Sequence, residues 1–131
     1  SSLHGIRIDA SDCPDLVPIL SVAAALAKGT TEIIHAERLR LKECDRLKAM
    51  ASELTKMGAH IEERPDGLII RGVPMLHGAG ADSWNDHRVA MSLAIAATRS
   101  DGPVILTGSE SVQKSYPQFW QDYESLGGKI K

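Results

Sequence analysis

The stretch DLVPILSVAAALAKG, residues 15–29, constrains the fold more strongly than any other part of the sequence. It predicts a helix from Leu16 to Lys28 that is apolar on most of its faces and ends at Gly29. Such a helix is buried, so other elements must cover it. Alternating strand patterns lie on either side of it, at residues 4–9 and 31–35.

The sequence after residue 35 continues with a helix and two strands. Apolar residues recur at helical spacing between Leu47 and Met57, and Gly58 stands where a C-terminal helix cap belongs. An Asp-Gly pair at residues 66–67, between two strand patterns, predicts a β-hairpin over residues 59–71. The predicted order is therefore strand, helix, strand, helix, strand, strand.

The second half of the chain repeats this order. A loop at residues 73–81 precedes a predicted helix at residues 87–98 and a strand at residues 104–107, and another helix follows. We therefore predict two similar units, residues 1–72 and residues 73–131.

The spacing of equivalent residues supports the repeat. Asp15 precedes Ile33 by eighteen positions, and Asp86 precedes Ile105 by nineteen. A period of roughly 60 residues is longer than the ~20–50 residues of solenoid repeats. The sequence thus predicts an α/β fold of the α+β type, built by duplication of one unit.

Composition favours a globular domain with an aliphatic core. Hydrophobic residues make up 43% of the chain but aromatic residues only 4%, so aliphatic side chains must fill the interior. The formal net charge of -2 provides no general attraction for nucleic acid or for an anionic membrane. Any site for an anion must therefore be local.

The remaining general features indicate a cytoplasmic location. Cys13 and Cys44 lack disulfide and metal-ligand spacings, which predicts free thiols, at least half-buried, in a reducing compartment. No apolar run approaches the ~20 residues of a membrane span, and no signal peptide precedes the first strand. Because the chain starts Ser1-Ser2-Leu3 without an initiator methionine, we expect it to be part of a longer protein.

The run LKECDRL, residues 41–47, places two cations and two carboxylates in five positions at the start of a predicted helix. A helix N-terminus carries roughly +0.5 of an elementary charge, which disfavours Lys42 and Arg46 there. A helix start that keeps both signs is suited to holding an anion and moving a proton beside it. The alternative is a solvated surface on which both cations pair with neighbouring carboxylates.

Cations recur near two other predicted helix starts. Arg88 lies three residues after Asn85, and Lys114 lies three residues before Pro117, which begins the last helix. If the three starts face one cleft, backbone N–H groups, helix dipoles and cations together favour a phosphate or a carboxylate. We therefore predict an anion site that includes Arg46, Arg88 and Lys114.

Two carboxylates and a histidine are candidates for proton transfer. Asp15 begins the buried helix, where it either caps the helix or accepts a hydrogen bond from a substrate hydroxyl. Glu43 stands beside Lys42, and flanking cations can tune the proton affinity of its carboxylate. His87 is either a satisfied surface or core histidine or, beside Arg88, part of the site.

Four motifs in register carry a resemblance along essentially the whole chain. They are Cys13-Pro-Asp15, the run at residues 41–47, Asn85-Asp-His-Arg88 and Lys114-Ser-Tyr-Pro117. Together they closely resemble the C-terminal part of the 5-enolpyruvylshikimate-3-phosphate synthase (3-phosphoshikimate 1-carboxyvinyltransferase) family. The resemblance implies two domains of three βαβαββ units each, and this chain would hold about two of the three units of one domain. It also implies that the other half of the site lies upstream, so that the isolated chain is inactive.

The resemblance further implies a transferase of the shikimate pathway. The family joins the enolpyruvyl (carboxyvinyl) group of phosphoenolpyruvate to the 5-hydroxyl of shikimate 3-phosphate and releases phosphate. The reaction proceeds by addition and elimination through a tetrahedral intermediate, without a metal ion or an organic cofactor, in enzymes that are typically monomeric. We accordingly expect these two small molecules and the upstream half of the same protein as partners, and neither nucleic acid nor a membrane.

Roles implied by the resemblance fall on residues already singled out. Asp15 matches the aspartate that contacts the shikimate hydroxyl and accepts its proton, and Lys42 matches a lysine that contacts shikimate 3-phosphate. Glu43 matches the glutamate implicated in proton transfer at the phosphoenolpyruvate methylene. His87 matches an active-site histidine. The matches to cations that bind phosphoenolpyruvate are Arg46, Arg88 and Lys114. The catalytic candidates are thus Asp15, Glu43, His87 and Lys114.

One departure from the family pattern falls at Arg38, where some members have an asparagine that helps to hold shikimate 3-phosphate. Arg38 is kept as a candidate contact for that substrate. Two alternative functions remain: an enolpyruvyl transferase for UDP-N-acetylglucosamine, which shares the architecture and phosphoenolpyruvate, and a non-catalytic anion-binding α/β domain. The motifs at residues 41–47 and 85–88 resemble the shikimate enzyme more than the first alternative.

Overall fold

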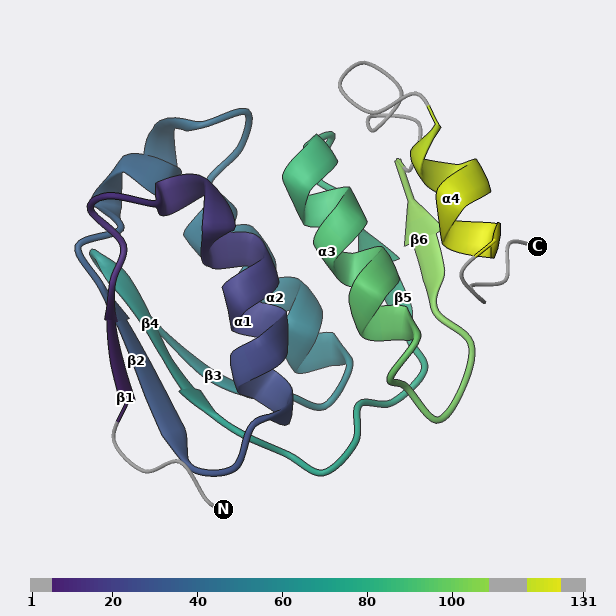
Figure 1. Ribbon diagram of the computed structural model, residues 1–131, viewed down its shortest axis with the longest axis horizontal. Helices are drawn as coiled ribbons and strands as arrows, with labels where there is room; N and C mark the ends of the chain where they lie inside the picture. The colour runs from purple at the N-terminus through teal and green to yellow at the C-terminus, as the bar shows by residue number, and fades with distance from the viewer. Residues whose placement is uncertain (1–5, 109–117, 126–131) are drawn as a thin grey trace.

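The computed structural model describes residues 6–108 and 118–125 and arranges them around two β-sheets (Figure 1). The first sheet contains β1 (Ile6–Asp9), β2 (Thr30–Ile34), β3 (His60–Arg64) and β4 (Gly67–Arg71). Its strand order is β1-β2-β4-β3, in which β1 is parallel to β2 and β4 is antiparallel to both of its neighbours. The sheet is therefore mixed.

A strand, a helix and a second, parallel strand occur in this order twice. Helix α1 (Val17–Leu26) connects the parallel strands β1 and β2. Helix α3 (His87–Ala97) connects β5 (Gly80–Asp82) to β6 (Ile105–Thr107), which form the second, parallel sheet. Neighbouring parallel strands need a crossover connection, and in both segments a helix provides it.

Three helices pack together beside the first sheet. Helices α1 and α2 (Arg46–Lys56) contact its strands, and α3 packs against both of these helices (Figure 1). Two short 3-10 helices, η1 (Pro14–Leu16) and η2 (Glu37–Leu41), precede α1 and α2 respectively. The starts of the three long helices are thereby brought to one region of the molecule.

The core between these helices and the first sheet is aliphatic, as the composition predicts. Leu47, Met50 and Leu54 lie on the buried face of α2 at the spacing that predicted this helix. The strands contribute Ile33 from β2 and Ile70 from β4, both fully buried. Among residues 6–108 and 118–125, no helix combines the length and the apolar character needed to cross a membrane.

The last described helix, α4 (Phe119–Ser125), packs on α3 through aromatic side chains. Phe119 lies against Ala90 and Ala94 of α3. The hydroxyl of Tyr123 donates a hydrogen bond to the carbonyl oxygen of Ala94 over 3.0 Å. The predicted start of this helix at Pro117 lies outside the described residues.

The first three predicted helices and the hairpin are confirmed to within two residues. Gly58, the predicted helix cap, has a φ of +94°, a conformation that glycine adopts at little cost. The hairpin pairs Arg64 with Gly67 across a two-residue turn. The loop predicted at residues 73–81 is wrong at its end, because β5 begins at Gly80. Gly, Ala and Asp all have low β propensity, and this strand exists through its pairing with β6.

A buried carboxylate joins α2 to the end of β5 and to the segment that follows it. Glu53 lies on α2 and is only 2% exposed. One of its oxygens accepts a hydrogen bond from the backbone N–H of Asp82 over 2.8 Å, and the other accepts one from the Trp84 indole over 2.9 Å. Lys56 supplies the matching positive charge at 2.9 Å. The second sheet is thus attached to α2 by polar contacts as well as by packing.

Gly67 provides a direct test of the hairpin geometry. A Cβ atom at this position would lie 1.8 Å from the backbone carbonyl oxygen of Ile33, which cannot move without disturbing β2. We expect Gly67→Ala to lower the free energy of unfolding of the chain by about 2–3 kcal/mol, the upper range for overpacking. A Cβ at Gly80 meets no atom within 4 Å, so Gly80→Ala serves as the matched control. Equal urea midpoints for the two variants would contradict the close approach of β4 to β2.

Candidate active site

Three carboxylates surround one buried guanidinium where the helices start. Arg46 is the first residue of α2 and only 2% exposed. Its Nε donates to Asp86 Oδ2 over 2.8 Å, its Nη1 to Asp15 Oδ1 over 3.2 Å and its Nη2 to Glu43 Oε2 over 2.5 Å. All three nitrogen atoms of Arg46 are therefore engaged by carboxylates from three separate segments.

A rim of half-buried and exposed charges lies around Arg46. Lys42 Nζ lies 3.9 Å from Asp15 Oδ1, and Arg88 Nη2 lies 3.8 Å from Asp15 Oδ2. His87 Nδ1 lies 3.4 Å from Glu43 Oε2. The structure thus brings together six predicted site residues from η1, from α3, from the start of α2 and from the loop before it. The six are Asp15, Lys42, Glu43, Arg46, His87 and Arg88.

Asp86 is a member of this cluster that the sequence indicated only as a helix cap. Its side chain is fully buried and accepts hydrogen bonds from the backbone N–H groups of Arg88 and Val89 at the start of α3. Burial alone would raise the pKa of Asp86, but the Arg46 guanidinium and these N–H groups outweigh it and hold the pKa below 3.8. Asp86 is therefore ionised at neutral pH.

The backbone before Asp86 is held in an uncommon conformation. Trp84 and Asn85 have φ values of +58° and +53°, in the left-handed region. Asparagine tolerates this region, but for tryptophan it costs on the order of 1–3 kcal/mol. The bond from Trp84 to Glu53 and a hydrogen bond from the Asp86 N–H to the Ser83 carbonyl oxygen hold the segment in place. No pattern in the sequence predicted two successive left-handed residues here.

Both cysteines are free and partly buried, as predicted. The Cys44 thiol lies 3.5 Å from Asp86 Oδ2. Burial, followed by the negative charge of Asp86 and the hydrogen bond to it, raises the pKa of Cys44 to about 12. The thiol is therefore protonated at neutral pH and is a poor nucleophile.

Two predicted residues are not placed in the cluster. Arg38 lies on η2 and is exposed, and its Nη2 lies 3.5 Å from the carbonyl oxygen of Ser11. No contact between Arg38 and the carboxylates around Arg46 occurs in the described part of the chain. Lys114 lies outside the described residues.

Glu43, Asp86 and His87 offer a set of ligand atoms within 4.8 Å of one another, which is the composition of a metal site. However, the guanidinium of Arg46 already bonds to both carboxylates of this set. A metal cation there would be repelled by Arg46 and would have to displace it. The donor set therefore does not fit a divalent cation while Arg46 is in place.

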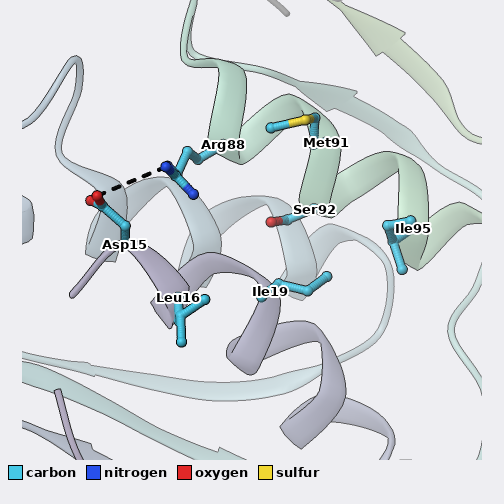
Figure 2. Close-up of a pocket in the computed structure, with 7 residues that line it drawn as sticks. All are labelled: Asp15, Leu16, Ile19, Arg88, Met91, Ser92 and Ile95. Atoms are coloured by element: carbon cyan, nitrogen blue, oxygen red, sulfur yellow. Dashed lines mark ion pairs between the residues drawn. The ribbon is translucent and has the colours of Figure 1, made fainter. Parts of the chain in front are cut away.

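A groove of about 250 Å³ runs from the cluster along α1 and α3. Figure 2 shows Asp15 and Arg88 facing each other at one end, with apolar side chains from both helices beyond them. The lining residues are Asp15, Leu16, Ile19, Arg88, Met91, Ser92 and Ile95. The exposed side of the cluster is thus continuous with an apolar surface.

The chemistry available in the cluster is anion binding together with proton transfer. Fixed cations at helix N-termini attract phosphate or carboxylate groups, and Arg adds planar, paired donors. Half-exposed carboxylates within 4 Å of those cations can accept or deliver protons at a bound ligand.

Comparison with known proteins identifies the family of the chain. Residues 1–123 match the family of EPSP synthase (3-phosphoshikimate 1-carboxyvinyltransferase). The chain is 62% identical over 130 residues to the 3-phosphoshikimate 1-carboxyvinyltransferase of Clostridium novyi (strain NT), and 56% identical over 132 residues to that of Clostridioides difficile (strain 630). Each match covers 99% of this chain and 30% of the relative.

Solved structures give the same result. An EPSP synthase from Acinetobacter baumannii matches with a TM-score of 0.85 and 35% identity, over 97% of this chain and 31% of that one. A second structure of EPSP synthase from this organism matches with a TM-score of 0.82 and 33% identity, over 99% of this chain and 31% of the other. The chain therefore spans about 30% of the length of the relatives that it matches.

Proposed function

Because this chain belongs to the EPSP synthase family, we propose that a longer protein containing it transfers the enolpyruvyl group of phosphoenolpyruvate to the 5-hydroxyl of shikimate 3-phosphate and releases phosphate. We refer to that longer protein as the full-length protein. The observation that carries the proposal is the cluster around Arg46. It gathers cations and half-exposed carboxylates from three helix starts at one place.

The proposed roles of the carboxylates follow from the protons that must move. In the addition step, the attacking hydroxyl loses a proton, which Asp15 accepts. The methylene carbon of phosphoenolpyruvate gains a proton, which the carboxyl group of Glu43 delivers. Both side chains are about half exposed, at 50% and 49%, so a ligand can reach them. Positioned acids and bases of this kind typically contribute about 10²–10⁴-fold to a rate.

The proposed roles of the cations follow from the charges of the substrates. Arg46 and Arg88 bind phosphoenolpyruvate together with Lys114, and Lys42 binds shikimate 3-phosphate. The charges of Arg46 and Arg88 already lie at helix starts before a ligand arrives, which lowers the cost of reorganisation during the reaction. His87 lies beside Glu43 and belongs to the same catalytic group. The exposed position of Arg38 makes it a candidate contact for shikimate 3-phosphate.

The remaining proposals concern the rest of the protein. The units at residues 1–72 and 73–131 form two of three in one domain, the protein is a cytoplasmic monomer, and no cofactor takes part. The exposed side chains of Leu16, Ile19 and Ile95 along the groove support a further unit that covers α1 and α3.

Packing of a further unit on α1 and α3 can be measured by hydrogen exchange. We expect backbone amides of α1 and α3 to exchange hydrogen at least tenfold more slowly in the full-length protein than in the isolated chain, because packing suppresses local opening. Amides of β3, an edge strand of the first sheet, serve as the internal control. Equal rates at α1 and α3 in both proteins would contradict a unit that packs on the groove.

The proposed reaction is tested by phosphate release from phosphoenolpyruvate in the full-length protein. We expect release with shikimate 3-phosphate, and none with UDP-N-acetylglucosamine or without an acceptor. Release with UDP-N-acetylglucosamine alone would assign the alternative transferase. Binding of phosphoenolpyruvate without release on any acceptor would assign the non-catalytic anion-binding domain.

A further inference from the structure

One carboxylate contacts the starts of two helices at once. Asp86 Oδ1 accepts from the backbone N–H groups of Arg88 and Val89, at 2.8 and 3.1 Å, and so caps α3. Its Oδ2 accepts from Nε of Arg46, the first residue of α2, at 2.8 Å. The two residues of this pair are 40 positions apart in the sequence. Asp86 thus sets the relative position of α2 and α3 where both carry site residues.

The two edges of the Arg46 guanidinium have different surroundings. The Nε edge faces Asp86, whose side chain is 0% exposed, and no solvent separates the pair. The Nη1 and Nη2 atoms face Asp15 and Glu43, which are half exposed. An arriving anion can displace half-exposed carboxylates at modest cost, because water takes over their solvation. Displacing the buried Asp86 would leave an unpaired buried charge and is strongly disfavoured.

We propose that Asp86 is a positioning residue that holds the Nε edge of Arg46 permanently, so that Nη1 and Nη2 form the edge that meets an anionic ligand end-on. This assignment rests on the proposed function for the identity of the ligand, phosphoenolpyruvate. The same carboxylate sets the position of Arg88 through its backbone N–H. The spacing of the two guanidinium groups therefore depends on one side chain that touches no substrate.

Capping alone does not require a carboxylate at this position. Asparagine caps a helix about as well as aspartate. However, the second polar atom of an asparagine that caps through its oxygen is an NH₂ group, which is a donor. In Asp86→Asn this NH₂ group would face the Nε–H of Arg46, and two donors cannot form a hydrogen bond with each other. Asp86→Asn therefore preserves the cap of α3 and removes the hold on Arg46.

Asp45 provides a matched control one residue before Arg46. It caps α2 by accepting from the Lys48 N–H, and it pairs with a different guanidinium, that of Arg40, at 2.9 Å. Asp45→Asn is therefore the same substitution at the same kind of cap, but its arginine partner lies outside the cluster.

The test compares the two variants in the full-length protein. We expect Asp86→Asn to raise KM for phosphoenolpyruvate at least tenfold and to lower kcat/KM by more than that. Its Tm should fall further than that of Asp45→Asn, because Arg46 loses a buried partner. Asp45→Asn should keep both constants within threefold of the original protein. A merely structural role for Asp86 would lower the Tm and leave KM unchanged, and that result would overturn the proposal.

A second readout does not depend on turnover. Because Asp86 holds Arg46 Nε, the Nε–Hε signal of Arg46 in ¹⁵N NMR spectra should be slow to exchange with water in the full-length protein. We expect this signal to disappear or exchange at least tenfold faster in Asp86→Asn, and in Asp86→Ser if the asparagine variant does not fold. It should persist in Asp45→Asn. An unchanged signal in the Asp86 variants would sink the positioning role, whereas absent transferase activity with the expected NMR result would count only against the proposed reaction.

Discussion

Arg46→Met is expected to lower the free energy of unfolding of the chain by about 3–5 kcal/mol at pH 7, the cost of leaving a buried charge without its partner. Methionine fills much of the volume of the arginine stem, so the loss reports the charge rather than a cavity. Asp86, which is 0% exposed, would then be an uncompensated buried carboxylate. Urea denaturation of the two chains measures the difference.

The pH dependence of this loss has a definite sign. In the original chain the pKa of Asp86 is held below its ordinary value. The stabilisation from the pair is therefore fully present above the unfolded pKa of about 3.9. It is lost as the pH falls through the lower pKa of the folded state. Without Arg46, the pKa of Asp86 is higher than in the original chain, because one of the groups that offset burial is gone, and the carboxylate takes up a proton at a higher pH. The difference between the two chains should therefore be largest at neutral pH and shrink in acid.

Two further variants serve as controls for the Arg46 result. The double variant Arg46→Met with Asp86→Asn removes both charges and should recover much of the lost stability. Lys48→Ala, at an exposed position on the same helix, should change stability by no more than about 0.5 kcal/mol. If Arg46→Met resembled Lys48→Ala at pH 7, the buried pair would not be a stabilising feature of the fold.

Glu43→Gln in the full-length protein is expected to reduce kcat for enolpyruvyl transfer by about 10²–10⁴-fold, the range for loss of a positioned acid or base. Glutamine has nearly the same shape but cannot deliver a proton. Because Glu43 is half exposed, its bond to Arg46 contributes little to stability, and we expect the Tm to stay close to that of the original protein. Steady-state kinetics at saturating substrates and a thermal melt separate the two effects.

The matched control for Glu43 is Glu37→Gln on η2. Glu37 is also an exposed glutamate that precedes α2 in the sequence, and it shows no contact with Arg46 in the described residues. Its kcat should remain within threefold of the original value. A similar kcat for both variants would remove Glu43 from the proton-transfer step.

Local signals in the sequence were sufficient for most of the elements. The apolar spacing from Leu47 to Met57 predicted α2, and the Asp-Gly pair at residues 66–67 predicted the hairpin. Strand β5 was missed because its residues have no strand propensity of their own and its partner, β6, lies more than 20 residues further along the chain. Short strands defined by pairing carry no local signal.

The residues of the candidate site likewise differ in whether a local signal in the sequence could identify them. Charged residues at helix starts identified Asp15, Glu43 and Arg46, because helix capping and helix dipoles act within a few residues. The contact between Arg46 and Asp86 joins residues 40 positions apart, and Asp86 already had a local explanation as a helix cap. A residue with two roles shows only the local one in its sequence neighbourhood.

Two polar links between α2 and residues 82–86 also determine how the molecule comes apart. Glu53 holds Asp82 and Trp84 near the end of α2, and Arg46 holds Asp86 at its start. Opening the second sheet alone would therefore remove buried hydrogen-bond partners from both Glu53 and Arg46. Because both links would break, separation of the second sheet from α2 is costly. The two sheets should therefore melt in a single cooperative transition.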